Sequence, residues 1–364
     1  MSQPKAVARV LERLTATSRK HRLLQSGQSV LVACSGGPDS TCLLHALFRV
    51  RRLLRIRLAV FHFDHRLRPS SADDAVYVKR QAARLGLPFF LREAEGKPSP
   101  GQSVEAWARL ARYAALTSVA TEASADVAAL GHTLDDQAET VLLGLVRGGG
   151  IDAVAGMPPA GKLPPLGMTA VRPLIETTRE EVLSFCRGLR LRPREDPTNR
   201  NRRFLRNRIR KEALPYLERT LDRNLKATLV RTAELVRADA TYLEALASEA
   251  SRQAVVIGDA EIKLDVTAIS ALPPVMAGRI VRQALRLAAA ALGGEWEQGV
   301  SSAHVRAVLD LVEGRPGRRV DLTGPLLALR NKEYVLVSRA SPEPHTRART
   351  PTRRAEGPRR REGA

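Results

Sequence analysis

The sequence predicts an α/β fold: a doubly wound, mostly parallel sheet, followed by a helical linker and a small α+β domain. Short apolar runs rich in β-branched residues alternate with segments of helical period through the N-terminal half. This alternation is typical of a parallel sheet that helices cover on both faces. Polar turns follow the apolar runs, at the carboxyl ends of parallel strands, where such sheets bind ligands. The length of 364 residues is sufficient for two cores.

The elements of the N-terminal half follow from this pattern in order. An amphipathic helix is predicted over residues 4–25, and strands at 28–34, 58–63, 88–92 and 127–130. Further helices are predicted from residue 41, over 71–85, over 104–122, after the turn 131–137, and over 178–190. The second of these begins with Ser71-Ala-Asp-Asp, which has the pattern of an N-cap. Residues 148–165 are rich in Gly and Pro and are expected to form a loop, with a short element at 172–174.

The C-terminal half has a different pattern. An Ala- and Leu-rich helical period runs over 213–254, and short strands are expected around 257–266, at 317–322 and at 334–337, with helices near 275–292 and 304–313. Residues 341–364 contain seven arginines and almost no apolar side chains, so we expect a disordered basic tail. The expected organisation is therefore a first domain at 1–212, a helical linker at 213–254, a second domain at 255–340 and the tail.

Composition limits the class of protein. The formal net charge is +21 and the isoelectric point is near 11, which favours a polyanionic partner. An Arg- and Ala-rich coding bias is the alternative source of this charge. The three cysteines form no Cys-x-x-Cys pair, so neither a zinc site nor an iron–sulfur cluster is indicated. We find neither a signal peptide nor an apolar run of membrane-spanning length, and expect a cytoplasmic protein without a membrane partner.

The most informative motif is Ser35-Gly-Gly-Pro-Asp-Ser40, which lies between a predicted strand and a predicted helix. Such a turn directs backbone N–H groups toward a phosphate at the helix N-terminus. It is not a Walker loop, because no Gly-Lys-Ser/Thr follows at the required spacing, and it is not the Gly-x-Gly-x-x-Gly turn of dinucleotide-binding folds. The alternative is a tight turn without a ligand.

This motif resembles the pyrophosphate-binding loop of the ATP pyrophosphatases, the PP-loop superfamily. Further segments resemble one family within it, the tRNA(Ile)-lysidine synthetases. They are FDHRLR (63–68), VEAWARLARYAAL (104–116), GHTLDDQAET (131–140), RGGGIDAVAGMPP (147–159), VRPL (171–174) and EDPTNRNRRFLRNRIR (195–210). The resemblance is strong over 20–215 and loose over 260–337, and the chain resembles the short form of the family, without a second C-terminal domain.

The resemblance implies an ATP-dependent carbon–nitrogen ligase. Such an enzyme joins L-lysine to C2 of the wobble cytidine of the CAU-anticodon isoleucine tRNA and so changes codon reading from AUG to AUA. Cytosine O2 would attack the α-phosphate of ATP, pyrophosphate would leave, and the lysine ε-amine would then displace AMP. The implied cofactors are ATP and Mg²⁺, and the implied partners are this tRNA and lysine. The second domain would bind the tRNA, and a homodimer is left open.

The resemblance also assigns the candidate nucleotide site. Ser35, Gly36, Gly37, Pro38, Asp39 and Ser40 would bind the phosphates of ATP. Asp39 is the candidate catalytic Mg²⁺ ligand, because Mg²⁺ on phosphates usually takes one or two carboxylates; a helix N-cap is the alternative role. Arg112 would be catalytic beside the adenylate, and Arg109, three residues earlier on the same helix face, would accompany it. A solvated helix face is the alternative for both arginines.

A second group of polar residues follows the fourth predicted strand: His132, Asp135, Asp136 and Glu139. By resemblance, Asp136 and Glu139 are catalytic residues that bind the incoming lysine, and His132 is a catalytic residue beside the activated intermediate. Capping of the helix dipole and a structural histidine are the alternatives. The sequence does not show which group takes the proton from the lysine amine. The basic residues of 200–211 are expected to contact tRNA phosphates.

Three other functions compete with this interpretation. A tRNA thiolase of the same superfamily would need catalytic cysteines, which this chain lacks in a suitable loop. The amidating GMP and NAD synthetases share the loop, but no glutaminase Cys–His–Glu set is evident. A non-catalytic RNA-binding module would have no use for both Asp39 and the acidic group at 135–139.

Overall fold

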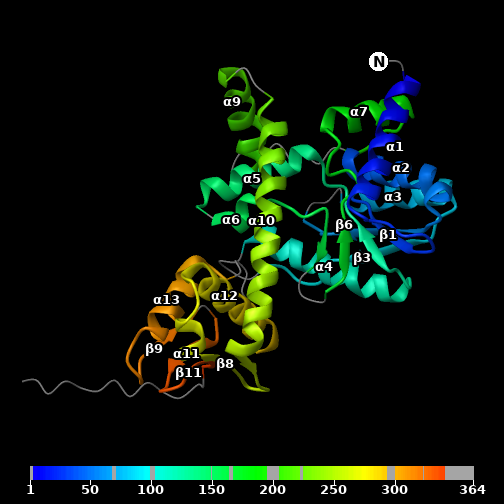
Figure 1. Ribbon diagram of the computed structural model, residues 1–364. Coiled ribbons are helices and arrows are strands. Elements are labelled where there is room, and N and C mark those ends of the chain that lie inside the picture. The colour runs from blue at the N-terminus through cyan, green and yellow to red at the C-terminus, as the bar shows by residue number, and fades with distance from the viewer. Residues whose placement is uncertain are drawn as a thin grey trace, which may run out of the picture.

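The computed structural model describes residues 3–67, 71–98, 103–148, 150–163, 167–194, 205–221, 224–292, 300–322 and 324–340. Figure 1 shows a larger N-terminal α/β unit and a smaller C-terminal unit, with one long helix running between them. Within the described ranges, none of the helices is both long and apolar enough to cross a membrane.

The N-terminal sheet has six strands in the order β3-β2-β1-β4-β6-β5. They are β1 (Ser29–Ala33), β2 (Arg57–Asp64), β3 (Phe89–Glu93), β4 (Val127–Ala129), β5 (Ala160–Lys162) and β6 (Thr169–Val171). Strands β1 to β4 and β6 pair in parallel, and β5 pairs with β6 antiparallel. Because β1 is followed by β2 on one side and has β4 on the other, the strand order reverses between β1 and β4. Ligands bind at such a switch point in sheets of this kind.

Helices cover both faces of this sheet (Figure 1). On one face lie α1 (Gln3–Lys20), α2 (Pro38–Leu54), α3 (Ser71–Leu85) and α7 (Arg179–Gly188), and on the other lies α4 (Val104–Glu122). Strand β1 contributes side chains to the cores on both faces, because successive side chains of a strand point to opposite faces. Val30 and Val32 pack in the first core, and Leu31 packs in the second. The predicted doubly wound, mostly parallel sheet is therefore confirmed.

A third, smaller core brings a later segment of the chain against α5 (Leu134–Val146), the helix that follows β4. Ala138 of α5 is buried together with Ile209, Leu214 and Val230. These residues belong to the π-helical turn η2 (Ile209–Ala213), to α9 (Leu214–Leu221) and to α10 (Leu225–Ala254), and α8 (Leu205–Arg208) precedes them. The packing places the arginine-rich segment 205–213 beside the start of α5.

Helix α10 has 30 residues and is therefore about 45 Å long at 1.5 Å per residue. It leads to a five-stranded sheet in the order β7-β8-β11-β10-β9. The elements of this unit are β7 (Val255–Ile257), β8 (Glu261–Asp265), α11 (Val266–Ser270), α12 (Pro274–Ala291), α13 (Ser302–Val312), β9 (Arg319–Asp321), β10 (Leu326–Arg330) and β11 (Tyr334–Arg339). Its strands pair antiparallel over a separate core, which confirms the small α+β unit.

Several elements differ from the prediction. The segment 148–165, expected to be a loop, contains α6 (Gly150–Val154) and strand β5. Strand β5 is Ala-Gly-Lys, which carries no β-branched residue, and its pairing with β6 defines it. Strand β10 was not predicted because its sequence, Leu-Leu-Ala-Leu-Arg, is rich in helix-forming residues. Helix α1 ends at Lys20 rather than near residue 25. The predicted tail at 341–364 lies outside the described residues.

Candidate active site

The phosphate turn, residues 35–40 after β1, leaves the N-terminus of α2 open. Gly37 is the N-cap residue, and no side chain caps it; Pro38 is the first helical residue. The Ser40 hydroxyl accepts a hydrogen bond from the Ser35 N–H and donates one to the Gly37 carbonyl, each at 3.1 Å, which closes the turn. Gly36 has φ +88°, a conformation that favours glycine. The uncapped N–H groups of the first turn of α2 can therefore bind an anion.

Gly131, which follows β4, packs directly against this turn. A Cβ atom on Gly131 would lie 3.1 Å from the carbonyl carbon of Asp39 and from the Ser40 N and Cα atoms. A side chain at this position would therefore push the start of α2 away from the turn after β4. Sequence reasoning assigned no role to Gly131, although a glycine immediately after a strand is a sign of close backbone approach.

Two further helices, α5 and α7, begin beside α2, and both have closed N-termini. Thr133 and Asp136 form a capping box on α5, and Thr178 and Glu181 form one on α7. The two helix starts are joined because the Leu134 N–H donates to the Thr177 carbonyl at 2.9 Å. Of these three helix starts, α2 is the one left open, and it is the one where we expect an anion to bind.

Asp39 lies in the first turn of α2, where it is not the N-cap residue that the alternative role required. Its Oδ2 atom is 2.5 Å from Nη1 of Arg179, and its Oδ1 atom is buried without a hydrogen-bond partner in the described part of the chain. Burial raises the pKa of Asp39 to about 6, against the opposing effect of the Arg179 charge. A buried carboxylate oxygen without a partner fits a Mg²⁺ ligand.

The Asp136 and Glu139 carboxylates, both on α5, are paired with two arginines. Glu139 is 1% exposed; its Oε2 lies 3.0 Å from Nε of Arg206, and its Oε1 lies 2.5 Å from Nε of Arg210. Asp136 Oδ1 lies 2.9 Å from Nη2 of Arg210, while Oδ2 accepts from the Thr133 N–H in the capping box. Burial favours a higher pKa for Asp136, but neighbouring positive groups outweigh it and hold this pKa below its usual value. Asp136 therefore both caps α5 and pairs with arginine side chains.

His132 lies beside Asp136 as a neutral side chain. Burial lowers the pKa of His132 to about 3; the Asp136 charge opposes this change and the Arg172 charge reinforces it. Nε of Arg172 donates to Nδ1 of His132 at 3.2 Å, so the imidazole proton is on Nε2. Arg172 itself is buried and donates to the Pro158 carbonyl at 2.8 Å. Sequence reasoning gave Arg172 no role, although it is a charged residue at the end of a buried strand.

Comparison with known proteins identifies the family. Residues 5–217 match the PP-loop domain. The tRNA(Ile)-lysidine synthase of Thermobifida fusca is 37% identical over 326 residues, which cover 89% of this chain and 96% of that protein. The chain belongs to the tRNA(Ile)-lysidine synthase family. The resemblance drawn from the motifs is thereby confirmed.

Other members of the tRNA(Ile)-lysidine synthase family are longer. The protein of that name from Symbiobacterium thermophilum is 39% identical over 287 residues, which cover 76% of this chain. The match spans 59% of the length of that relative. Among solved structures, the U34-tRNA thiolase NcsA from Methanococcus maripaludis has a similar fold, with a TM-score of 0.55 at 17% identity. That similarity covers 65% of this chain and 80% of the thiolase.

The two arginines predicted beside the adenylate lie on α4 in this family member. The guanidinium carbons of Arg109 and Arg112 are 5.3 Å and 5.5 Å from the ring centroid of Tyr113. Arg109 is exposed and Arg112 is half-buried. Arg112 also acts on His132, because its charge contributes to the low pKa of that imidazole. Arg112, Arg172 and Arg206 thus provide positive charge around His132, where an anion would be stabilised.

Two arginines of the run predicted to contact tRNA have partners inside the site, whereas Arg208 and Lys211 of the same run are exposed. Arg206 and Arg210 point into the site and bind its carboxylates rather than forming an outer surface. Lys226, at the start of α10, likewise lies 3.0 Å from Oδ1 of Asp135. The reason is the third core, which holds this segment against α5. Arg200, Arg202 and Arg203 lie outside the described residues.

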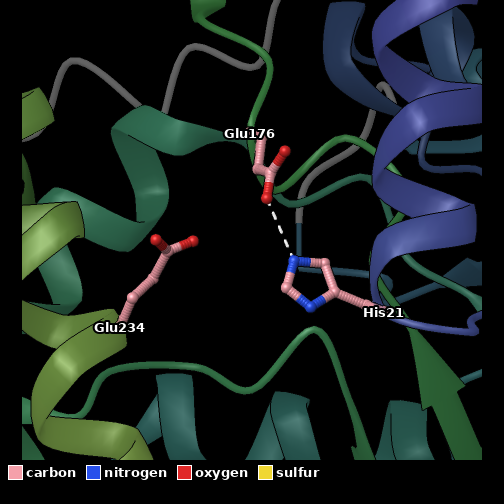
Figure 2. A group of neighbouring side chains, drawn as sticks. All are labelled: His21, Glu176 and Glu234. Atoms are coloured by element: carbon pink, nitrogen blue, oxygen red, sulfur yellow. Dashed lines mark hydrogen bonds and ion pairs between the residues drawn. The ribbon is translucent and has the colours of Figure 1, made fainter.

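A separate cluster of possible metal ligands lies between the end of α1 and α10. Figure 2 shows His21, Glu176 and Glu234, with His21 Nε2 3.0 Å from Glu176 Oε1. Their ligand atoms lie within 4.8 Å of one another, and no other such cluster occurs in the ranges described. The ammonium of Lys20 lies 2.8 Å from Glu176 and 3.3 Å from Glu234. Lys20 thus supplies the positive charge that a metal ion would bring, and we interpret the cluster as an ionic link between helices.

Proposed function

We propose that this protein ligates L-lysine to C2 of the wobble cytidine of the CAU-anticodon isoleucine tRNA, converting ATP to AMP and pyrophosphate. One observation carries the proposal. The close packing of Gly131 on Asp39 and Ser40 unites the open N-terminus of α2 with the carboxylates at the start of α5. The proposed phosphate site and the proposed site for an ammonium group would therefore share one edge of the sheet. The names of the relatives support the choice of tRNA.

The first step concerns the phosphates of ATP. The phosphate turn binds the triphosphate through the N–H groups of α2, and Arg112, with Arg109 beside it, neutralises the adenylate. Cytosine O2 attacks the α-phosphorus, an O2–P bond forms, and the bond to the bridging oxygen breaks so that pyrophosphate leaves. Asp39 would hold Mg²⁺, which would neutralise charge on the phosphates.

The second step concerns lysine. Its ε-amine attacks C2, the N–C2 bond forms, the C2–O2 bond breaks, and AMP leaves with O2. Asp136 and Glu139 bind the lysine, and since both hold arginines in the free protein, Arg206 or Arg210 must yield a position to it. The amine must lose a proton before it attacks.

The arrangement of His132 bears on that proton. Its Nδ1 accepts from Arg172, and its Nε2 carries a hydrogen, so it can donate to the intermediate but cannot take the lysine proton in this arrangement. The carboxylates of Asp136 and Glu139 are then the acceptors within reach of the bound amine. We therefore assign His132 to binding of the intermediate and the carboxylates to proton removal.

We extend the proposal to the organisation of the chain. Residues 1–212 would carry out the ATP and lysine chemistry, 213–254 would act as a helical linker, and 255–340 would contact the tRNA. A separate hydrophobic core in the C-terminal unit and the net charge of +21 support this division.

The rival sulfur-transfer reaction is disfavoured by the cysteines. Cys34, Cys42 and Cys186 are buried as free thiols. Burial raises the pKa of all three thiols, that of Cys186 to about 12, so they are poor nucleophiles at neutral pH.

The decisive experiment is incorporation of labelled lysine into a tRNA pool, with and without ATP. We expect ATP-dependent labelling of the isoleucine tRNA with one AMP formed per lysine incorporated. The Asp39→Ala variant should form no AMP while binding tRNA nearly as well as the unmodified protein. Tight tRNA binding without AMP or label in the unmodified protein would refute the proposal and favour an RNA-binding module.

A further inference from the structure

Arg179 is the first residue of α7, and its backbone and side chain have separate partners. The backbone N–H donates to Oδ2 of Asp135 at 2.7 Å, which joins α7 to α5. The guanidinium extends in another direction, to Oδ2 of Asp39 in the phosphate turn. Because Thr178 and Glu181 cap α7, the helix start does not depend on the Arg179 side chain. The guanidinium is therefore available for a role at the turn.

A second arginine beside the phosphate turn provides a contrast. The Arg194 N–H donates to the Gly36 carbonyl, but its guanidinium binds two carboxylates of α3, those of Asp73 and Asp74. The Arg194 guanidinium is thus held away from the turn. The Arg179 side chain is one-third exposed, and its bond to Asp39 uses one of five N–H donors. Of these two arginines, Arg179 is therefore the one placed to meet a ligand at the open end of α2.

Binding of a nucleotide at α2 would change the charges around Arg179. In the free protein the Arg179 guanidinium balances the Asp39 carboxylate. The free Oδ1 of Asp39 could hold a cation, whose charge would repel the guanidinium, and a triphosphate at the adjacent helix N-terminus would attract it. A guanidinium forms strong, often bidentate bonds to phosphate oxygens.

We propose that Arg179 binds the pyrophosphate part of ATP, transferring from Asp39 to the β- and γ-phosphates and neutralising the leaving group when the α-phosphorus is attacked. The inference rests on the proposed function, because it places the triphosphate at α2. If it is right, the Arg179 side chain contributes to the binding of ATP and pyrophosphate but not to the binding of AMP. A purely structural ion pair with Asp39 predicts no such distinction.

Calorimetric titrations without tRNA test the proposal. The probes are Mg·ATP, Mg·pyrophosphate and AMP, at about pH 8, where carboxylates are ionised. The variants are Arg179→Gln, Arg179→Lys and the control Arg187→Gln, which removes the same charge elsewhere. Arg187 is exposed on the same helix, where it contacts Ser184. Circular dichroism confirms that each variant is folded.

We expect Arg179→Gln to weaken pyrophosphate and ATP binding by roughly tenfold to a hundredfold, while AMP binding is unchanged. Arg179→Lys should restore part of the loss, and Arg187→Gln should bind all three probes like the unmodified protein. Equal pyrophosphate affinity in Arg179→Gln and the unmodified protein would overturn the inference, as would an equal loss for AMP. An unmodified protein that binds neither ATP nor pyrophosphate would instead overturn the proposed function.

Discussion

Asp39→Asn is predicted to stabilise the ligand-free protein while it abolishes AMP formation. Burial raises the pKa of Asp39 from 3.8 to about 6. Because the folded pKa exceeds the unfolded value, the folded chain holds this proton more tightly, and ionisation lowers stability. The loss begins near the unfolded pKa and is complete above the folded pKa. A difference of about two pKa units between the folded and unfolded chain lowers the free energy of unfolding by about 3 kcal/mol at pH 8, and by about half of that at pH 5. The amide of Asn carries no charge and removes this pH-dependent loss.

Thermal unfolding in metal-free buffer at about pH 5 and pH 8 measures the effect. We expect the stability advantage of Asp39→Asn to grow by about 1–2 kcal/mol from the lower to the higher pH, or by roughly 3–6 °C in Tm. Asp135→Asn is the matched control. Asp135 accepts from the Arg179 N–H and pairs with Lys226, so this variant should lose stability. An advantage of Asp39→Asn that is the same at both pH values would refute the reasoning.

Three further predictions concern other contacts. Glu139→Gln should raise the lysine KM roughly tenfold to a hundredfold more than the ATP KM, because a buried charge-assisted contact is lost; equal changes in both constants would contradict this. Gly131→Ala places a Cβ 3.1 Å from the backbone of the phosphate turn, so AMP formation should fall by about tenfold or more while tRNA binding persists; an unchanged kcat would count against the packing argument. Arg279→Met should destabilise the contact between α12 and α6 by about 1–3 kcal/mol, because Arg279 is 8% exposed and bonds Asp152 at 3.2 Å. A double-mutant cycle with Asp152→Ala should show coupling between the two residues, and additive effects on stability would disprove the prediction.

The sequence was sufficient to predict the features that depend on local chemistry. The turn after β1 could be predicted because a small-residue motif lies between an apolar run and a helical period, and a helix after β4 because the polar turn 131–137 follows an apolar run. The packing of Gly131 on Asp39 depends on the strand order, in which β4 lies beside β1 although about a hundred residues separate them. That adjacency is a property of the topology and is not encoded in either segment alone.

The charge pairing in the site was the least predictable feature. Arg206 and Arg210 belong to a run of similar residues, and the sequence contains no signal to separate those that face solvent from those that bind Glu139. The π-helical turn at 209–213 and the burial of Ile209 set their direction. The side chain of Arg179 was overlooked for a similar reason, because the first residue of a capped helix can extend toward either neighbour.

The pairing of Glu139 with Arg206 and Arg210 also determines how the protein should respond to salt. In the proposed reaction, lysine would enter by exchanging one cation for another of equal charge, so ionic screening would weaken the departing and arriving contacts alike. The apparent lysine affinity then depends on the fraction of molecules in which an arginine has withdrawn. Binding of a tRNA releases counterions and weakens steeply with salt. As ionic strength rises, the affinity for tRNA should therefore fall steeply, while the affinity for lysine should change little.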